Sequence, residues 1–192
     1  MKIVTVPHQI LRQQAQPVAS VNRQLQRLLT DLQATLTHSE IGVGLAAPQI
    51  GSNLRIFALN LPKESNKEIP EYHYFINPLI TKYDQKTAFG TDPKGQPDLE
   101  GCLSIPRIYA AVRRPVSIDV TYQTLENGSL TTKKQHFQDF SARVFQHECD
   151  HLDGRLFTDL ALEQHTQLYL DTDDQLEKIT PAELFKIFGG EF

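Results

Sequence analysis

The chain has 192 residues, of which 40% are hydrophobic and 22% are charged, and its formal net charge is -4. This composition is typical of a globular protein with a buried core, and the negative charge gives no overall attraction for nucleic acid, so we expect no DNA partner. Because no long apolar stretch and no signal-peptide core is visible, we expect no membrane partner and a cytoplasmic location.

The first half of the chain predicts one helix and two strands. In residues 21–40, leucines recur at helical spacing and predict an amphipathic helix. The stretch "IGVGLAAPQIG" (41–51) combines three glycines with a proline and predicts a tight loop whose backbone approaches another group closely. Apolar runs at 54–61 and 73–80 are typical of strands. Residues 82–99 are polar and turn-rich, so we expect an exposed, mobile excursion there.

The second half begins with a hairpin signal. Residues 116–124 and 129–137 have the pattern of strands and are joined through Asn127 and Gly128, a dipeptide that favours tight hairpin turns. The two segments therefore predict an antiparallel pair.

Two helices are predicted after the hairpin. The first has Asp139 or Ser141 as an acceptable N-cap and ends at Gly154, a natural C-terminal residue. The second begins at residues 180–183, where threonine, proline and glutamate have the spacing of a capping box.

This order of elements predicts an α+β fold in a single domain, residues 1–192, with a mostly antiparallel sheet packed around a central helix and further helices towards both ends. The chain has two cysteines, Cys102 and Cys149. In a reducing cytosol we expect no disulfide between them, which leaves a thiolate available as a metal ligand.

The stretch "QHECDHLDG" (146–154) has the HExxH spacing of many zinc hydrolases. On a helix with about 100° per residue, His147 and His151 lie about 40° apart and share a face with Glu148. Two neutral imidazoles can hold one divalent cation, with the carboxylate beside a water molecule as a general base. Cys149 points to the back of the helix and is expected in the core. The alternative is a solvated helix whose histidines are accidental.

The third ligand separates the classes of protein that share this motif. Proteases with the longer HExxHxxGxxH motif need a final histidine, and Phe157 occupies that position. Another class of zinc metalloprotease would take Glu163 or Glu177. Cys102, in the strand-like stretch "LEGCLSIP", is an upstream candidate that would give a Cys/His/His site. A binding module with a structural metal is a third alternative, but it would need a fourth protein ligand, and none is evident.

Three stretches in this order, "GVGLAAPQ" (42–49), "EGCLS" (100–104) and "QHECDHLDG" (146–154), together resemble the peptide deformylase family. Its members remove the formyl group from the N-terminal methionine of new polypeptides. The resemblance covers essentially the whole chain. It implies one divalent ion per chain, most often Fe2+ with Zn2+, Ni2+ or Co2+ as substitutes, and it implies these ligands: Cys102, His147 and His151.

The resemblance also implies the catalytic residues and the substrate. Glu148 would take the proton of the attacking water and pass it to the leaving amine. The side-chain amide of Gln49 and the backbone N–H of Leu103 would stabilise the oxyanion. The implied partners are N-formyl-methionyl nascent peptides and, transiently, the ribosome. The segment from Asp159 onward is rich in acid, so we do not expect this tail alone to hold ribosomal RNA.

A pocket for the methionine side chain should lie beside the metal ligands, because helix neighbours three and four residues apart share a face. The expected pocket residues are Val43, Gly44, Phe140 and Val144. Arg143 is on the same side of the helix, where many members of the family have an aliphatic residue; it either rims the pocket or snorkels away at the surface. Behind the ligands, Glu100 is expected to pair with Arg114.

Overall fold

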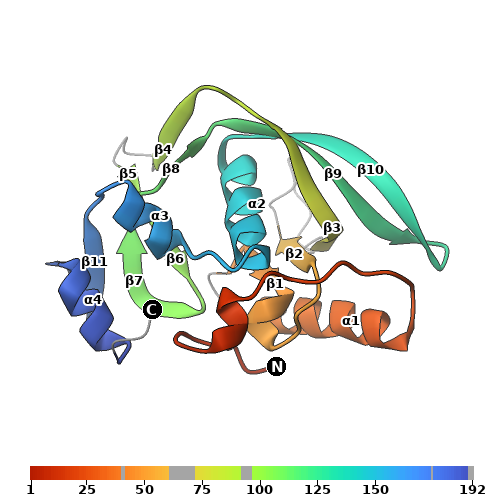
Figure 1. The fold of residues 1–192 in the computed structure, drawn as a ribbon, viewed down its shortest axis with the longest axis horizontal. Coiled ribbons are helices and arrows are strands. Elements are labelled where there is room, and N and C mark those ends of the chain that lie inside the picture. The colour runs from red at the N-terminus through yellow and green to blue at the C-terminus, as the bar shows by residue number, and fades with distance from the viewer. Residues whose placement is uncertain (40–41, 61–71, 92–96, 174, 190–192) are drawn as a thin grey trace.

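The computed structural model describes residues 1–39, 42–60, 72–91, 97–173 and 175–189. These residues form four α-helices, two short 3-10 helices and twelve strands (Figure 1). In chain order the elements are η1 (Gln9–Arg12), α1 (Arg23–Thr37), β1 (Gly44–Ala46), η2 (Ala47–Ile50), β2 (Ile56–Asn60), β3 (Tyr72–Tyr83), β4 (Thr87–Thr91), β5 (Pro97–Asp98), β6 (Glu100–Cys102), β7 (Ile105–Ala110), β8 (Arg113–Pro115), β9 (Ser117–Glu126), β10 (Ser129–Gln138), α2 (Asp139–Leu152), α3 (Phe157–Glu163), β11 (Leu168–Thr172), β12 (Gln175–Ile179) and α4 (Pro181–Ile187).

The strands form three sheets. The largest has the order β1-β2-β3-β9-β10, a second has β12-β11-β7-β6, and the smallest has β5-β4-β8. Each pairing between these strands is antiparallel, and the isolated bridge from Gln16 to Leu54 is parallel. The expected α+β fold with mostly antiparallel sheets is confirmed. No helix within the described ranges is long and apolar enough to cross a membrane.

Helix α1 confirms the helix predicted within residues 21–40, of which residue 40 lies outside the described part. It begins after Asn22, whose side chain accepts a hydrogen bond from the N–H of Leu25 at 2.9 Å. This bond satisfies one of the free N–H groups at a helix start. The buried leucines of α1 pack with residues of β1 and β2, including Leu45 and Ala58.

The predicted strands and hairpin are present. Strands β2 and β3 correspond to the runs at 54–61 and 73–80, with residue 61 outside the described part. In the β9–β10 hairpin, Asn127 and Gly128 have φ values of 50° and 79°. Two successive left-handed residues match the twist of an antiparallel pair, which explains the preference for this dipeptide.

The exposed, mobile excursion expected over residues 82–99 is confirmed only in its exposure: residues 82–91 are exposed or half-buried, whereas most of the described segment forms strands. Strand β3 continues to Tyr83, β4 covers Thr87–Thr91, and β4 pairs with both β5 and β8. One of the two strands that pair with β4 is β8, which lies outside this segment, so the local composition gave no sign of it. Residues 92–96 lie outside the described part of the chain.

The start of α2 also differs from the prediction. Neither Asp139 nor Ser141 is the N-cap; that position belongs to Gln138, which provides no side-chain cap. Gln138 is still paired with Ser117 as the last residue of β10, so the strand runs directly into the helix. The predicted C-terminal end is confirmed, because Gly154 follows α2 with a φ of 71°.

Aromatic rings fill the space between α2 and the five-stranded sheet. The ring of Phe145 on α2 meets Phe57 edge-on at a centroid distance of 4.9 Å and Phe75 at 5.0 Å. Cys149 is buried in the same cluster, as predicted, and both cysteines are free thiols. Since this face of α2 packs on the sheet, the opposite face, which carries His147, points towards β6 (Figure 1).

The end of α2 generates a stability prediction. A Cβ on residue 154 would lie 2.7 Å from the carbonyl oxygen of Arg12, whereas a Cβ on Gly51, with a φ of 83°, would meet nothing within 4 Å. Gly51→Ala should cost about 1–2 kcal/mol for its left-handed backbone alone. Gly154→Ala should cost more, because the backbone at Arg12 must also move. Urea unfolding of both variants measures their free energies of unfolding. Equal losses of this free energy would contradict a role for the close approach of residue 154 to the backbone of Arg12.

Candidate metal centre and active site

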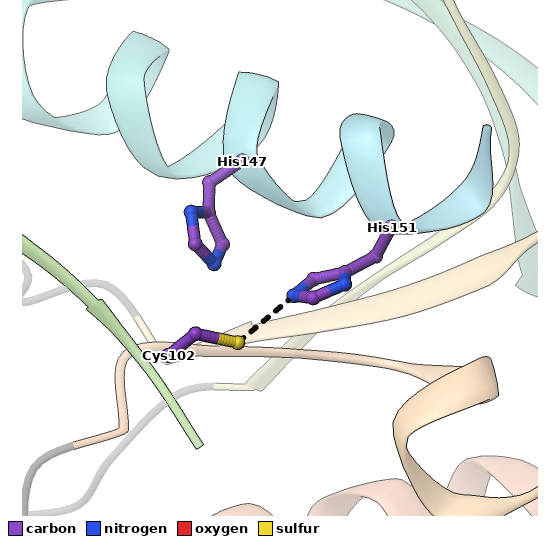
Figure 2. A group of neighbouring side chains, drawn as sticks. All are labelled: Cys102, His147 and His151. Carbon is purple, nitrogen blue, oxygen red and sulfur yellow. Dashed lines mark hydrogen bonds between the residues drawn. The ribbon is translucent and has the colours of Figure 1, made fainter. Parts of the chain in front are cut away.

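Two histidines of α2 and the cysteine of β6 converge on one point (Figure 2). One ligand atom from each of Cys102, His147 and His151 lies within 4.8 Å of the other two. The sulfur of Cys102 is 3.2 Å from Nε2 of His151. In a tetrahedral zinc site, bond lengths near 2.3 Å to sulfur and 2.1 Å to nitrogen place those two atoms about 3.6 Å apart. The three residues therefore form a possible site for one divalent ion.

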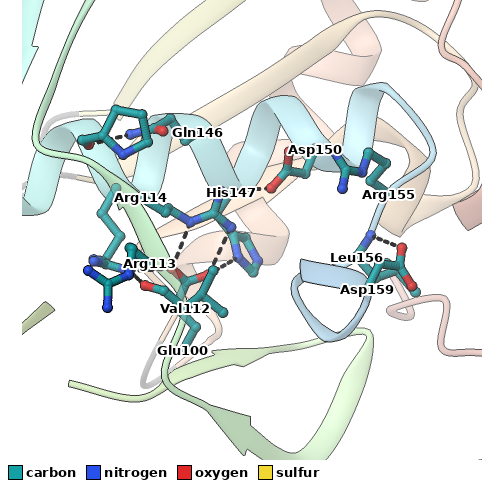
Figure 3. A network of polar contacts seen from close by, with 12 residues as sticks. Glu100, Val112, Arg113, Arg114, Gln146, His147, Asp150, Arg155, Leu156 and Asp159 are labelled. Atoms are coloured by element: carbon teal, nitrogen blue, oxygen red, sulfur yellow. Dashed lines mark hydrogen bonds and ion pairs between the residues drawn. The ribbon is translucent and has the colours of Figure 1, made fainter. Parts of the chain in front are cut away.

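A buried carboxylate orients one of the imidazoles (Figure 3). Nδ1 of His147 lies 3.2 Å from Oε2 of Glu100. Since an ionised carboxylate only accepts hydrogen bonds, Nδ1 is the donor, and Nε2 faces the possible metal site, where a bound metal ion would take the place of its proton. Burial opposes the ionisation of Glu100, but the attraction of Arg114 and the bond from His147 outweigh it, so the pKa of Glu100 lies below its ordinary value.

The expected pair between Glu100 and Arg114 is present and is bidentate. Nε and Nη2 of Arg114 donate to the two carboxylate oxygens at 2.7 and 2.9 Å. Nη1 of the same guanidinium donates to Asp150 on α2 at 2.8 Å (Figure 3). Arg114 thus connects β8, β6 and α2 through charge-assisted hydrogen bonds, the stronger kind.

Arg143 is buried, so the alternative of a surface arginine is wrong. Its Nη1 donates to Glu100 at 2.6 Å and to the carbonyl of Val112 at 2.7 Å, and its Nη2 donates to the carbonyl of Ala88 at 2.9 Å. A Cβ on Gly90 would lie 3.0 Å from Nε of Arg143, so the glycine lets β4 approach the guanidinium closely. Arg143 therefore holds β4 against α2 and adds a second positive charge beside Glu100.

The two imidazoles have opposite electrostatic surroundings. Burial disfavours the charged form of His147, but hydrogen bonds with Cys102 and Glu100 outweigh it and raise its pKa. For His151, burial and the neighbouring charge of His147 both lower the pKa. His151 is therefore held in the neutral form that binds metal ions.

Glu148 lies on the same face of α2 and is buried. Its Oε2 has no hydrogen-bond partner among the described residues. Burial raises the pKa of Glu148 to about 7, against smaller opposing effects of His147 and Arg114. A Cβ on Gly44 would lie 2.8 Å from the carboxyl carbon of Glu148, so only a glycine lets β1 pass this close.

The glycine-rich stretch is more regular than the predicted tight loop, because Gly44–Ala46 forms β1 and Ala47–Ile50 forms η2. It brings Gln49 to the site. Oε1 of Gln49 accepts a hydrogen bond from the N–H of Ala46 at 2.8 Å, and its Nε2 lies 3.3 Å from Oγ of Ser104 and 3.5 Å from the sulfur of Cys102. The amide donor is therefore fixed next to the three possible ligands.

These groups surround a cavity of about 540 Å³. The predicted residues that line it are Val43, Gly44, Gln49, Cys102, Leu103, Phe140, Val144, His147 and Glu148. Sequence reasoning missed other lining residues, and those with polar side chains are Asp98, Arg107 and Tyr109. Arg107 and Tyr109 belong to β7, whose sequence "IPRIYA" has no motif that marks it as part of a site.

The thiol of Cys102, the imidazole of His147 and the carboxylate of Glu148 line one cavity, and the imidazole of His151 lies beside the thiol. This combination is typical of a metal-dependent hydrolase. Residues 1–167 match the family model described as polypeptide deformylase. The chain belongs to this family, and it is a hydrolase of the deformylase type rather than a zinc metalloprotease.

Curated relatives and solved structures agree with the family. The peptide deformylase of Mesorhizobium japonicum is 40% identical over 157 residues, which are 82% of this chain and 81% of that protein. That of Orientia tsutsugamushi is 36% identical over 189 residues, 95% of this chain and 96% of that one. The crystal structure of a probable peptide deformylase from Synechococcus phage S-SSM7 superposes with a TM-score of 0.72 at 34% identity, covering 83% of this chain and 99% of the phage chain.

The raised pKa of Glu148 predicts a pH-dependent effect of Glu148→Gln on the metal-free protein. An unfolded glutamate titrates near pH 4.3, whereas the pKa of the folded residue is about 7. Between these values the folded state binds a proton that the unfolded state does not, so stability falls as pH rises. The Glu148→Gln variant lacks this loss, so its stability relative to the parent should grow up to about pH 7, by at most about 4 kcal/mol.

Urea unfolding at about pH 5 and about pH 8 measures this difference. Glu163→Gln, which removes an exposed carboxylate of α3, is the matched control. An advantage of Glu148→Gln that is the same at both pH values would show that the carboxylate does not titrate in this window.

Proposed function

We propose that this chain removes the formyl group from the N-terminal formyl-methionine of newly made polypeptides and releases formate. The observation that carries the proposal is the position of Cys102, whose sulfur reaches the two histidines of a HExxH helix. The family match over residues 1–167 supports the same activity.

We propose Fe2+ as the resident ion, with Zn2+, Ni2+ or Co2+ as substitutes, bound by the sulfur of Cys102 and by Nε2 of both His147 and His151. Sulfur and imidazole donors suit these transition metals, whereas magnesium and calcium prefer oxygen. The bound ion would supply positive charge that lowers the pKa of a nearby water molecule and polarises a carbonyl. α2 is then the central metal-binding helix of the fold.

Glu148 is the proposed general base and then the general acid. It accepts the proton of the attacking water and returns it to the amine that leaves. Its Oε2 is buried and makes no hydrogen bond with a described residue, so the carboxylate is available for a proton. A pKa of about 7 suits a group that must both accept and donate a proton near neutral pH.

Gln49 and Leu103 are the proposed oxyanion donors. Attack on the formyl carbon places negative charge on the formyl oxygen, and fixed N–H donors stabilise that charge. The N–H of Ala46 holds Oε1 of Gln49, which directs the amide nitrogen towards Cys102. The backbone N–H of Leu103 belongs to the residue that follows the thiol, so it lies at the same edge of the cavity.

The methionine side chain is proposed to lie against Val43, Phe140 and Val144, with the backbone of Gly44 alongside. All four line the cavity. Val144 is buried, whereas Phe140 is 47% exposed. An apolar wall of this kind suits a thioether side chain.

The glutamates that a metalloprotease would need as third ligand are elsewhere. Glu163 forms an ion pair with Arg155 at 2.8 Å, and Glu177 is an exposed residue of β12. Neither belongs to the group of Cys102 and the two histidines that lies within metal-binding range.

We further propose that residues 1–192 act as one cytoplasmic catalytic domain that meets its substrates as they leave the ribosome, with transient ribosome contact. Two observations support this. The C-terminal strand β11 pairs with β7, next to the strand that carries Cys102, and both cysteines are free thiols.

Glu148→Ala should abolish formate release from a formyl-methionyl peptide while the metal remains bound, because Glu148 moves protons and does not ligate. Cys102→Ser should instead lose most of the metal. Formate assays paired with metal analysis of the purified variants separate the two roles. Glu163→Ala is the control and should keep both metal and activity. Retention of metal by Cys102→Ser together with its loss by Glu163→Ala would support the protease instead.

Gln49→Leu should lower kcat by about 100- to 1,000-fold, as expected for the loss of one oxyanion donor. Bound metal should stay the same, because Gln49 contributes no ligand in this proposal. Steady-state kinetics with a formyl-methionyl tripeptide provide the measurement. A kcat within about a factor of three of the parent would remove Gln49 from the list of donors, since the loss of an oxyanion donor should lower kcat far more.

A further inference from the structure

Strand β7 does not run straight past β6. Gly101 pairs with Tyr109, but the next residue of β6, Cys102, pairs with Ile105. Residues 106–108 of β7 therefore have no partner on β6 and form a bulge. Bulges of this kind re-aim side chains and are frequent beside active sites. Arg107 is the middle residue of the bulged segment, and it lines the cavity.

The backbone of Arg107 is in the left-handed region, with a φ of 67°. A residue with a Cβ pays free energy for this conformation, which glycine would adopt without strain. Strain of this kind persists where the surrounding structure holds the residue in place, and it is concentrated at functional sites. The strained backbone therefore makes the side chain of Arg107 a candidate for a functional role.

Strand β11 holds this side chain in place. Its pairing with β7 ends at Leu170 and Ile108, where the next step would join Asp171 to Arg107. Arg107 has left the extended conformation, and its side-chain Nε donates to the carbonyl oxygen of Asp171 at 2.7 Å instead. The guanidinium is thus held at the cavity by a strand beyond residues 1–167, the part that matches the family model.

The charge of Arg107 is not neutralised by a described residue. The other arginine that lines the cavity, Arg143, is paired with Glu100 at 2.6 Å. Arg107 is exposed and forms no ion pair with any residue in the described part of the chain. The carboxylate of Asp98 also lines the cavity, and its negative charge disfavours an acidic substrate side chain next to Asp98. A substrate therefore meets one anchored, unpaired cation on the β7 side.

We propose that Arg107 is a specificity-determining residue that favours substrates with an aspartate or glutamate among the first residues after the formyl-methionine. The proposal rests on the proposed deformylase activity. An exposed ion pair contributes modestly, so we expect a preference of about two- to fivefold in kcat/KM. Because the contact is made when the peptide binds and does not touch the reacting atoms, the preference should appear in KM and not in kcat.

The test compares formyl-Met-Asp-Ala with formyl-Met-Asn-Ala, and formyl-Met-Ala-Asp with formyl-Met-Ala-Asn, all as C-terminal amides so that the side chain is the only carboxylate. The metal-loaded enzyme should prefer the aspartate peptide in at least one pair, and added salt should reduce the preference. In Arg107→Gln the ratio within each pair should fall to about one.

The matched control is Arg27→Gln, which removes the same charge from an exposed position of α1, away from the cavity, and should keep the parent ratio. A parent ratio of about one in both pairs, or a preference that survives in Arg107→Gln, overturns the proposal. Release of formate without a charge preference contradicts the role of Arg107 alone. Failure of every peptide to release formate contradicts the deformylase activity itself.

Discussion

The site depends on one buried carboxylate. Glu100 accepts hydrogen bonds from Arg114, Arg143 and His147, which come from β8 and α2. Burying these charges costs free energy that only close pairing offsets, so loss of Glu100 would leave the charges of Arg114 and Arg143 poorly compensated in the interior. Since Glu100 is two residues before Cys102 on the same short strand, the contact that orients an imidazole also places the thiol opposite it.

Each sheet positions a different part of the site. The five-stranded sheet holds α2 through the ring of Phe145, and its edge strand β1 brings Gly44 against Glu148. The four-stranded sheet carries Cys102 and, through its bulge, Arg107. The three-stranded sheet supplies Arg114 and the carbonyl of Ala88 that fixes Arg143. The cavity lies where these parts meet, so its chemistry is distributed over segments far apart in the sequence.

Much of the site follows from local rules. Four-residue spacing on a helix is sufficient to bring His147 and His151 together, and Asn127-Gly128 is sufficient for the hairpin. The proposed third ligand is different, because the spacing of the motif left Cys102 and two glutamates open. The order of three motifs in the sequence was needed to favour Cys102. The burial of Arg143, the pairing of β4 with β8 and the hydrogen bond from Arg107 to Asp171 all depend on partners distant in the sequence, which no local pattern contains.

The central claim is that a sulfur from β6 and two nitrogens from α2 bind the same ion. X-ray absorption spectroscopy of the metal-loaded protein measures this most directly, because sulfur and nitrogen neighbours differ in scattering and in bond length. The account predicts one sulfur at about 2.3 Å and two imidazole nitrogens at about 2.1 Å, with the sulfur shell absent in Cys102→Ser. A shell of nitrogen and oxygen alone in the parent protein would contradict it.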